Sequence, residues 1–319
     1  MPGVKLGFVV PTWTTTSLSW RDVLEVSHAA VDVGFDSLWV TDHLLQESTN
    51  AELRHRAGLS VPEAAEEIAE GYLECFSTLA ALASVLGRVQ LGSFVACAGY
   101  RSPALLGKIA DAIDSISDGR FVLGVGAGDS EEEHQRFGFP TDHSVSRFEE
   151  TLAILNGLFR NGDLEFSGEH YQVRQARLFP RGPRKDGSPI MIGTFNPGPR
   201  MQRLVVQYAD IWNAFLGYGI ASPEAAAAAS AVIDDACRRY GRNPASLKRT
   251  VAIRVALPEG KYSSGPGEQS LSGSPEQMAE VLARFGDFGI DEVQCGLVPG
   301  TVKGVQAFGE VIAHLANRY

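Results

Sequence analysis

Short β-rich runs alternate with helical patterns along the whole 319-residue chain, and this rhythm constrains the fold more than any other feature. Parallel strands joined by helical crossovers produce such an alternation. The predicted strands are residues 4–10, 36–41, 89–96, 121–126, 190–193, 210–215, 250–257 and 291–298. Because a helical pattern follows each of the eight runs, the sequence predicts a (βα)8 TIM barrel of the α/β class, in preference to an open doubly wound sheet.

The helices between these strands have recognisable start signals. In 103–117 apolar residues recur at helical spacing, with Ser102 at the N-cap and Pro103 at the first helical position. Ser146 and Ser274 each open a capping-box pattern. Helices are expected over 20–33, 75–86, 103–117, 147–159, 198–208, 275–286 and 303–318, and after Ser222-Pro223.

Three longer segments interrupt the rhythm within what is expected to be one domain over residues 1–319. Residues 44–74 are a polar excursion, 160–188 predict a hairpin followed by a loop rich in Pro, Gly and basic residues, and 258–274 are rich in Gly, Ser and Pro. Loops of this length are often functional, so we interpret all three as lid-like insertions.

Composition excludes several classes of function. The net charge of −10 disfavours sequence-independent binding to nucleic acid or to an anionic membrane surface. The N-terminus lacks a signal-peptide pattern and no apolar run is long enough to span a membrane, which predicts a cytoplasmic protein. The scattered Cys75, Cys97, Cys237 and Cys295 are expected to be reduced and mostly buried.

If the chain is a barrel, its site lies where the strands run into the following loops. Gly124-x-Gly126-x-Gly128 follows the fourth strand, but its spacing and position differ from a Rossmann dinucleotide loop, so sharp turning and ligand contact remain equal explanations. Asp129 is either the N-cap of the next helix or a carboxylate directed into the site.

Two further loops at this end of the barrel carry polar groups. His43, directly after the second strand, can titrate near neutrality or hydrogen-bond a heteroaromatic ring. The loop from Gly193 to Arg200 offers backbone N–H groups and a helix N-terminus, which suit a phosphate. No metal site is expected, because Glu131 to His134 lack a second histidine, and no nucleophile elbow is present.

Eight further sets of residues stand in a distinctive order along the chain: Val4–Gly7, Gly34–His43, Leu91–Ser93, Tyr100–Pro103, Asp114–Ser117 with Gly119-Arg120, Leu123–Gly128, Ile192-Gly193 and Ala209–Asn213. Together these segments resemble the luciferase-like monooxygenase superfamily, and most closely its branch that uses the deazaflavin coenzyme F-420. The resemblance covers nearly the whole chain. It implies a TIM barrel with an extra segment and a flavin-like ring bound at the barrel mouth.

The resemblance also implies roles for individual residues. Asp42 and His43 would touch the ring, with His43 as proton donor, and a cis peptide bond at Ser93-Phe94 would support the face of the ring. The cofactor phosphate would lie on Gly193, Thr194 and Phe195, with Gly126 and Gly128 also binding cofactor, and Asp129 would correspond to an acid of some family dehydrogenases. Arg54, Arg181, Arg184 and Lys185 are candidate contacts for the acidic tail of the coenzyme.

The expected function is therefore hydride transfer between coenzyme F-420, an 8-hydroxy-5-deazaflavin, and a small organic substrate, with His43 or Asp129 handling the proton. The first alternative is an FMN-dependent monooxygenase that uses reduced flavin and oxygen with a partner flavin reductase. A non-catalytic cofactor-binding protein is the second, and an NAD(P) enzyme or a lyase on the same barrel is another. The resemblance also implies a homodimer.

Overall fold

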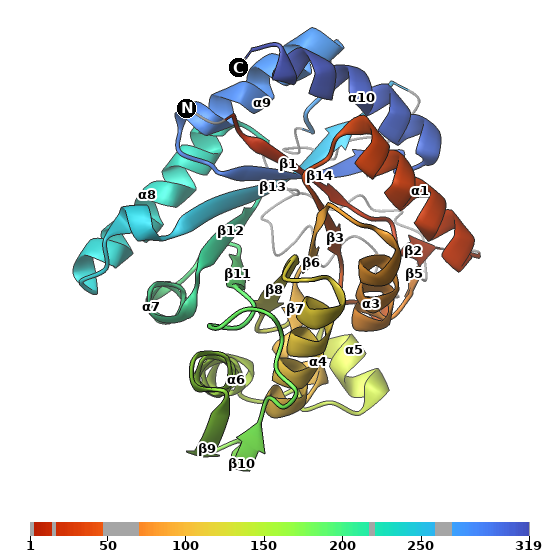
Figure 1. Cartoon of the computed structure of the whole chain (residues 1–319). Coiled ribbons are helices and arrows are strands. Elements are labelled where there is room, and N and C mark those ends of the chain that lie inside the picture. Colours follow the sequence, from red (N-terminus) through yellow and green to blue (C-terminus); the bar gives the residue numbers. More distant parts are fainter. Residues whose placement is uncertain (1–2, 15–16, 47–69, 217–220, 259–269, 319) are drawn as a thin grey trace.

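Eight parallel strands close into a barrel in the computed structural model, which describes residues 3–14, 17–46, 70–216, 221–258 and 270–318 (Figure 1). The barrel strands are β1 (Lys5–Val9), β3 (Ser37–Val40), β6 (Gln90–Ser93), β8 (Phe121–Gly126), β11 (Ile190–Thr194), β12 (Ile211–Phe215), β13 (Lys248–Ala256) and β14 (Glu292–Val298). Parallel pairing of β8 with β11 closes the sheet into a cylinder. The predicted barrel is confirmed, with a strand in each predicted run.

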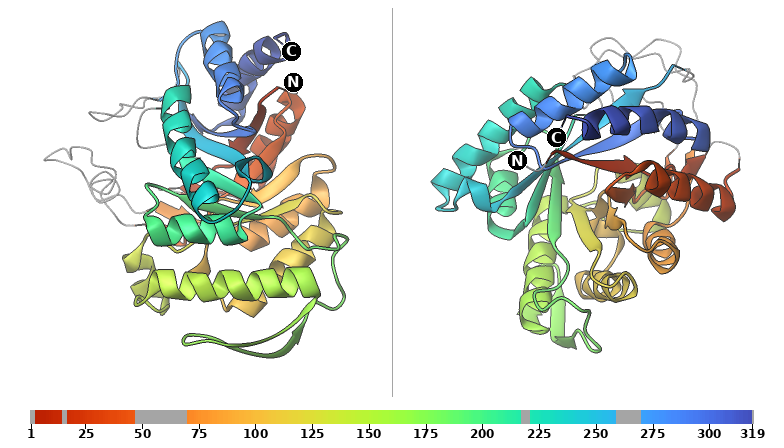
Figure 2. Two further views of the ribbon diagram at one scale, coloured as in Figure 1. Left: turned by 90° about the vertical axis from the view of Figure 1, so that its left-hand side faces the viewer. Right: turned by 45° about the horizontal axis from the view of Figure 1, so that its top comes forward.

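Helices surround the barrel, as two further views show (Figure 2). They are α1 (Trp20–Val33), α3 (Cys75–Val85), α4 (Pro103–Ile116), α5 (Glu131–Phe137), α6 (Ser144–Asn161), α7 (Pro199–Tyr208), α8 (Pro223–Arg239), α9 (Pro275–Asp287) and α10 (Val302–Ala316). Ser102, Ser222 and Ser274 are N-caps as expected, and Ser274 forms a full capping box with Gln277. The sequence signals therefore located these helix starts correctly.

The expected capping box at Ser146 is wrong. The N-cap of α6 is His143, which adopts a left-handed conformation with φ of 54°, so the helix begins earlier than the sequence signal. The Ser146 hydroxyl instead accepts a hydrogen bond from Arg200 Nη2 at 3.1 Å. A tertiary contact to α7 has replaced the local capping interaction.

Side chains fill the inside of the barrel. The interior cluster comprises Val9, Trp39, Phe94, Val122, Met191, Ile211 and Ala252. The Trp39 ring lies over Gly92, where a Cβ would be 2.2 Å from Trp39 Cζ3. Beside the cluster, Trp39 Nε1 donates to Glu292 Oε1 at 2.8 Å, and Asn213 Nδ2 donates to Gln294 Oε1 at 2.7 Å. The barrel is thus a packed core, and ligands have to bind at its mouth.

The insertion at 160–188 begins with the predicted hairpin, β9 (Asp163–Ser167) and β10 (Gln172–Arg177). The loop after it is fixed by α4: Lys108 donates to the carbonyl oxygen of Phe179, and Arg184 pairs with Asp114. Arg184 also donates to the carbonyl oxygen of Phe121, the first residue of β8. This loop therefore lies at the amino ends of the strands, away from the mouth, a position that argues against the lid interpretation of 160–188.

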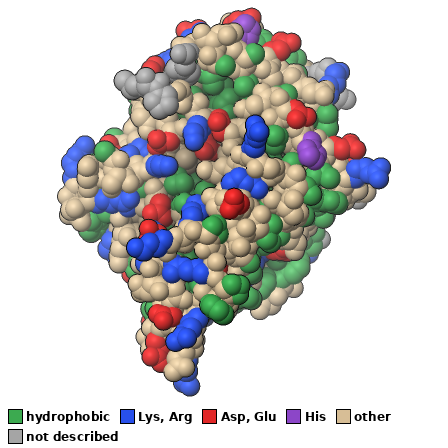
Figure 3. Space-filling view, in the orientation of Figure 1, with side chains coloured by type: hydrophobic (Ala, Val, Ile, Leu, Met, Phe, Trp, Pro, Cys, Tyr) green, Lys and Arg blue, Asp and Glu red, His purple; other side chains and the backbone are tan. Residues whose placement is uncertain are grey.

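Positive and negative side chains are interspersed on the face seen in Figure 3, and no broad basic area is visible there. Among the described helices none is long and apolar enough to cross a membrane. The four cysteines are free and buried, as expected.

The two ends of the polar excursion join a short strand from the loop after β1 in a small antiparallel sheet beside the mouth. It consists of β2 (Trp13–Thr14), β5 (Glu70–Tyr72) and β4 (Leu45–Gln46), with β5 in the middle. Residues 47–69, which include Arg54, and residues 259–269 lie outside the described residues, so the lid interpretation of 44–74 and 258–274 stays a prediction. The short strand β7 (Ala96–Cys97) and the 3-10 turns η1 (Ala98–Tyr100) and η2 (Pro244–Ser246) complete the elements of the described chain.

Candidate active site

Asp42, just beyond β3, is buried and anchors two neighbouring segments. Its carboxylate accepts hydrogen bonds from Arg101 Nη1 at 2.7 Å, Arg101 Nη2 at 2.9 Å and the Cys97 backbone N–H at 2.9 Å. Arg101 also donates to Glu74 Oε1 at 2.6 Å and lies over the ring of Phe76. The Asp42 carboxylate is therefore engaged by the protein, and its contact with a cofactor ring stays a prediction.

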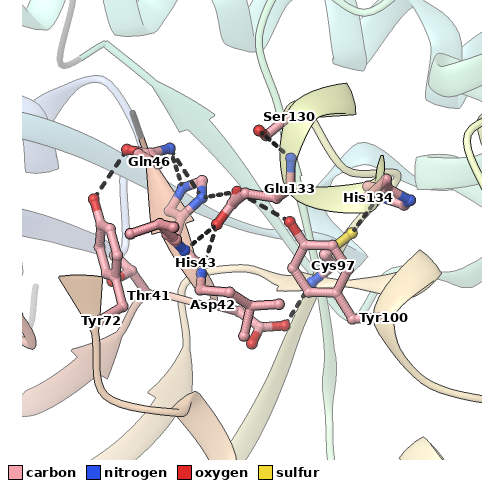
Figure 4. Close-up of polar contacts among 12 residues, drawn as sticks. Thr41, Asp42, His43, Gln46, Tyr72, Cys97, Tyr100, Ser130, Glu133 and His134 are labelled. Atoms are coloured by element: carbon pink, nitrogen blue, oxygen red, sulfur yellow. Dashed lines mark hydrogen bonds and ion pairs between the residues drawn. The ribbon is translucent and has the colours of Figure 1, made fainter. Parts of the chain in front are cut away.

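His43 lies next to a fully buried carboxylate (Figure 4). Its Nδ1 is 2.8 Å from Oε2 of Glu133, and 23% of the His43 side chain is exposed. The same Glu133 oxygen accepts from the Tyr100 hydroxyl at 3.0 Å, while Oε1 accepts from the backbone N–H groups of Leu44 at 2.5 Å and Leu45 at 3.0 Å. One carboxylate thus fixes the loop after β3 and the ring of its histidine.

The electrostatics favour a protonated histidine beside an ionised glutamate. Burial is the largest single influence on the pKa of His43 and lowers it, but the hydrogen bond to Glu133 and the charges of Asp129, Glu133 and Asp42 together raise the pKa above its usual value. For Glu133, burial acts in the opposite sense and raises the pKa of the carboxyl. The contact with His43 and the two backbone N–H groups outweigh burial, so the pKa of Glu133 lies below its usual value. His43 is therefore suited to donate a proton near neutral pH.

A second group of side chains flanks His43 on the side of the small sheet. The Tyr72 hydroxyl donates to Gln46 Oε1 at 3.0 Å, and Gln46 Nε2 lies 3.0 Å from Nδ1 and 3.3 Å from Nε2 of His43. The Tyr72 ring is 5.3 Å from the His43 ring and 6.2 Å from the Trp13 ring, measured between centroids. Polar and aromatic groups thus share this wall of the mouth.

The cis peptide bond after β6 lies one position further along than expected. It joins Phe94 to Val95, not Ser93 to Phe94. The Phe94 N–H still donates to the carbonyl oxygen of Val40 at 2.7 Å, so the chain leaves the sheet only after Phe94. Ser93 is fully buried and donates from its hydroxyl to the carbonyl oxygen of Gly124 at 2.7 Å.

The glycines predicted to bind cofactor make room for side chains of the chain itself. A Cβ at Gly126 would lie 2.9 Å from Val95 Cγ2, and one at Gly193 would lie 3.0 Å from Val95 Cγ1. Gly128 has a φ of 90°, and a Cβ there would lie 2.7 Å from Cys97 Sγ. These glycines therefore shape the mouth around Val95 and Cys97, and direct contact with a ligand stays a prediction.

The loop after β11 presents one aromatic side chain outward. The Thr194 hydroxyl accepts from Trp212 Nε1 at 2.9 Å and is buried, whereas 51% of Phe195 is exposed. Phe195 packs edge-on against Phe215 with ring centroids 5.1 Å apart. Arg200 and Arg203, which follow this loop, both pair with Glu149. Their charges are therefore already balanced by a carboxylate of the chain.

Asp129 is not the N-cap of α5. Ser130 holds that position, and its hydroxyl accepts from the Glu133 backbone N–H at 3.2 Å. Asp129 is exposed in the loop after β8, and its negative charge contributes to the raised pKa of His43. The Asp129 carboxylate is thus near enough to His43 for its charge to act on the ring, and its role as an acid stays a prediction.

The basic residues expected to hold the coenzyme tail are elsewhere. Arg184 pairs with Asp114 at the amino ends of the strands, and Arg181 donates to the carbonyl oxygens of Phe159 and Lys185 in the same region. This expectation is wrong for Arg181, Arg184 and Lys185, because the loop that carries them enters β11 from the end opposite the mouth.

Sequence reasoning missed Glu133 and Tyr100. Glu133 stands in a run of three glutamates, and only the fold distinguishes this buried member from the exposed Glu131 and the half-buried Glu132. The available signal was position: the third residue of a helix opening directly after a Gly-rich strand end faces back toward that end.

Among the described residues no group of three or more His, Cys, Asp or Glu side chains is arranged to hold a metal ion.

The mouth offers an apolar face that suits a planar ring. Half-buried Trp13, Val95 and Phe215 pack against the interior cluster, and Phe195 extends this face outward. His43 and Gln46 supply hydrogen-bonding groups at its edge. Apolar side chains with a few polar groups at their edge are the usual lining of cofactor sites, so the residues present fit a flavin-like ring.

Comparison with known proteins identifies the family of the chain. Residues 2–261 match the family model described as luciferase-like monooxygenase. The chain is 34% identical over 300 residues to the pyrimidine monooxygenase RutA of Pseudomonas savastanoi pv. phaseolicola, covering 78% of this chain and 80% of that protein. It is 30% identical over 256 residues to the phthiodiolone/phenolphthiodiolone dimycocerosates ketoreductase of Mycobacterium bovis, covering 77% of this chain and 64% of the relative.

Among solved structures, a secondary alcohol dehydrogenase dependent on coenzyme F-420, in complex with an adduct of the coenzyme and acetone, superposes with a TM-score of 0.76. That similarity covers 98% of this chain and 99% of the other at 18% identity, so it shows the fold alone. The family match and the sequence relatives carry the assignment of family. The chain belongs to the luciferase-like monooxygenase family and is an enzyme of its oxidoreductase and monooxygenase group.

Proposed function

We propose that this enzyme transfers a hydride between coenzyme F-420 and a small organic substrate, and that His43 exchanges the accompanying proton. The observation that carries the proposal is the contact of His43 with the buried Glu133 at the barrel mouth. Reduction of a carbonyl group requires a proton as well as a hydride, and a histidine with a raised pKa is a suitable donor. The ketoreductase among the relatives is named for this kind of chemistry.

In this proposal the chain binds, orients and supplies the proton, while the coenzyme, when bound, supplies the carbon that gives or takes the hydride. Val95, Phe195 and Phe215 would contact the ring face. His43 would keep Nδ1–H on Glu133 and exchange its proton through Nε2. The remaining predicted contacts at the mouth, Asp42, Ser93, Phe94, Gly126, Gly128, Gly193 and Thr194, would support or border the ring, and Asp129 is the second candidate acid.

The second candidate is a monooxygenase that uses reduced FMN and oxygen. The pyrimidine monooxygenase at 34% identity favours this candidate, because the match to it covers 80% of that protein, whereas the match to the ketoreductase covers 64%. In that case a partner reductase would supply the reduced flavin. The same apolar face and the same histidine would serve, so the two candidates differ in the ring and in the need for oxygen.

A binding titration separates these candidates. The purified protein is titrated with coenzyme F-420 and with FMN, each oxidised and reduced, and ring fluorescence and absorbance are followed. Selective binding of the deazaflavin followed by oxygen-independent reduction of a ketone panel supports the first proposal. Preference for reduced FMN and oxygen consumption supports the second.

Binding of a ring without turnover on any substrate would leave a cofactor-binding protein. Absence of binding by either ring would contradict both proposals. Sedimentation of the same preparation tests the homodimer that we also propose from the family resemblance.

A further inference from the structure

We propose that Glu133 is a positioning residue that fixes the orientation and tautomer of His43, so that Nδ1 keeps its hydrogen on the carboxylate and Nε2 is the atom that exchanges protons. This inference deepens the proposed function and rests on it only for the part that His43 plays in turnover.

All four acceptor positions of the Glu133 carboxylate are occupied, three by the loop after β3 and one by Tyr100. Oε2 receives His43 Nδ1 and the Tyr100 hydroxyl, and Oε1 receives the backbone N–H groups of Leu44 and Leu45. An ionised carboxylate only accepts hydrogen bonds, so its Nδ1 partner has to carry a hydrogen. The other ring nitrogen, Nε2, does not contact the carboxylate and lies 3.3 Å from Gln46 Nε2, so it is the nitrogen that can exchange a proton.

The helix that carries Glu133 is itself held in place. The next residue, His134, is buried, with Nδ1 2.6 Å from the carbonyl oxygen of Pro140 and Nε2 3.3 Å from Cys97 Sγ. Ser130 caps the first turn. Because α5 is anchored on both sides of Glu133, the carboxylate cannot follow movements of His43, and the histidine ring is oriented by it.

The charged and titratable groups around His43 come from every element packed against it. Glu133 lies on α5, Asp129 in the loop after β8 and Asp42 at the end of β3, where Arg101 pairs with Asp42. Among the described residues, Tyr72 on β5 also lies beside the His43 ring, and Tyr100 on η1 contacts its carboxylate partner. Glu133 is the member in direct contact with the ring, so its removal is expected to affect His43 most.

The test is a pH titration of the histidine side chains by nuclear magnetic resonance, in the wild type and in Glu133→Gln. The His43 signals are assigned from their absence in His43→Asn. In the wild type we expect a pKa above that of free imidazole and a neutral form with the hydrogen on Nδ1. In Glu133→Gln the pKa is expected to fall by about 1–3 units, the usual effect of losing an opposite charge in contact.

Matched variants separate positioning from general structural damage. Glu132→Gln removes the same charge from a neighbour that pairs with Arg136 and has 39% of its side chain exposed, and it should leave the His43 titration unchanged. Glu133→Asp keeps the charge but shortens the side chain, so it should restore part of the pKa and of the turnover lost in Glu133→Gln. Circular dichroism confirms that each variant is folded.

In turnover, the pH profile of kcat gives a second readout. Carbonyl reduction should decline as pH rises through the pKa of His43, and this decline should move to lower pH in Glu133→Gln while coenzyme affinity is retained. An unchanged His43 pKa in Glu133→Gln, or an equal fall in Glu132→Gln, would overturn the inference.

The wild-type titration decides the matter even if Glu133→Gln does not fold. A neutral His43 with its hydrogen on Nε2, or a pKa at or below that of free imidazole, contradicts the inference. Failure of the proposed function is distinguishable, because absence of coenzyme binding and turnover leaves the titration of the unliganded protein unaffected.

Discussion

Replacement of Arg101 by methionine should destabilise the protein strongly and in a pH-dependent way. The side chain of Asp42 is fully buried, and Arg101, with 11% of its side chain exposed, contributes two of its three hydrogen bonds. Removal of one partner from a buried ion pair typically costs about 3–5 kcal/mol, because the other charge remains buried and unpaired. At about 2–4 °C per kcal/mol, the melting temperature should fall by roughly 6–20 °C.

The sign of the pH dependence follows from the pKa of Asp42. Burial raises this pKa, and Arg101 and the Cys97 N–H oppose the effect, so the variant leaves burial largely unopposed. Between the pKa of Asp42 in the unfolded chain, about 3.9, and its raised pKa in the folded variant, the native state holds more bound protons than the unfolded state. Its stability therefore falls as pH rises, and the deficit of the variant relative to the wild type should be larger at pH 8 than at pH 5.

Urea denaturation at both pH values measures this deficit. Arg238→Met is the matched control, since Arg238 pairs with Asp235 at the surface with 62% and 71% of the two side chains exposed, and it should be nearly neutral. Adding Asp42→Asn to Arg101→Met should recover much of the loss. A loss no larger than that of Arg238→Met, or one independent of pH, would refute the reasoning.

Two further predictions concern packing. Gly124→Ala would place a Cβ 2.0 Å from the carbonyl oxygen of Ser93 and should destabilise the barrel by about 1–3 kcal/mol or more, whereas Gly87→Ala, with open space around it, should not; equal unfolding curves for the two would contradict the packing argument. The four buried cysteines should resist alkylation at pH 8 until the protein unfolds, because burial raises the pKa of each thiol, that of Cys97 to about 12. Rapid labelling of the folded protein, read by mass spectrometry, would count against this.

Local sequence signals predicted the barrel well because periodicity and helix caps act over a few residues. The eight strands and the N-caps at Ser102 and Ser222 are of this kind. At Ser146 the same reasoning was wrong, because Arg200 from another helix binds the hydroxyl. Local pattern thus fails where a contact across the fold takes over the side chain.

The candidate site was only partly predictable for the same reason. His43 could be located from the end of its strand, but its carboxylate partner, Glu133, is 90 positions away in the sequence. Arg184 was a candidate contact for an anionic tail because it lies in a basic loop of the sequence. In the fold its charge is neutralised by Asp114 on α4, which the local sequence does not show. Charge in a sequence indicates potential partners, whereas the fold determines which of them are already occupied.

The amide of Gln46 has one consequence for the movement of protons at this site. An amide has a donor end and an acceptor end, and in this structure the NH2 group faces His43 while the oxygen accepts from the Tyr72 hydroxyl. A half-turn of the amide would bring the oxygen to a protonated Nε2 and the NH2 group to the Tyr72 oxygen. Gln46 can therefore act as an adapter that hydrogen-bonds both protonation states of His43 without any change in the backbone.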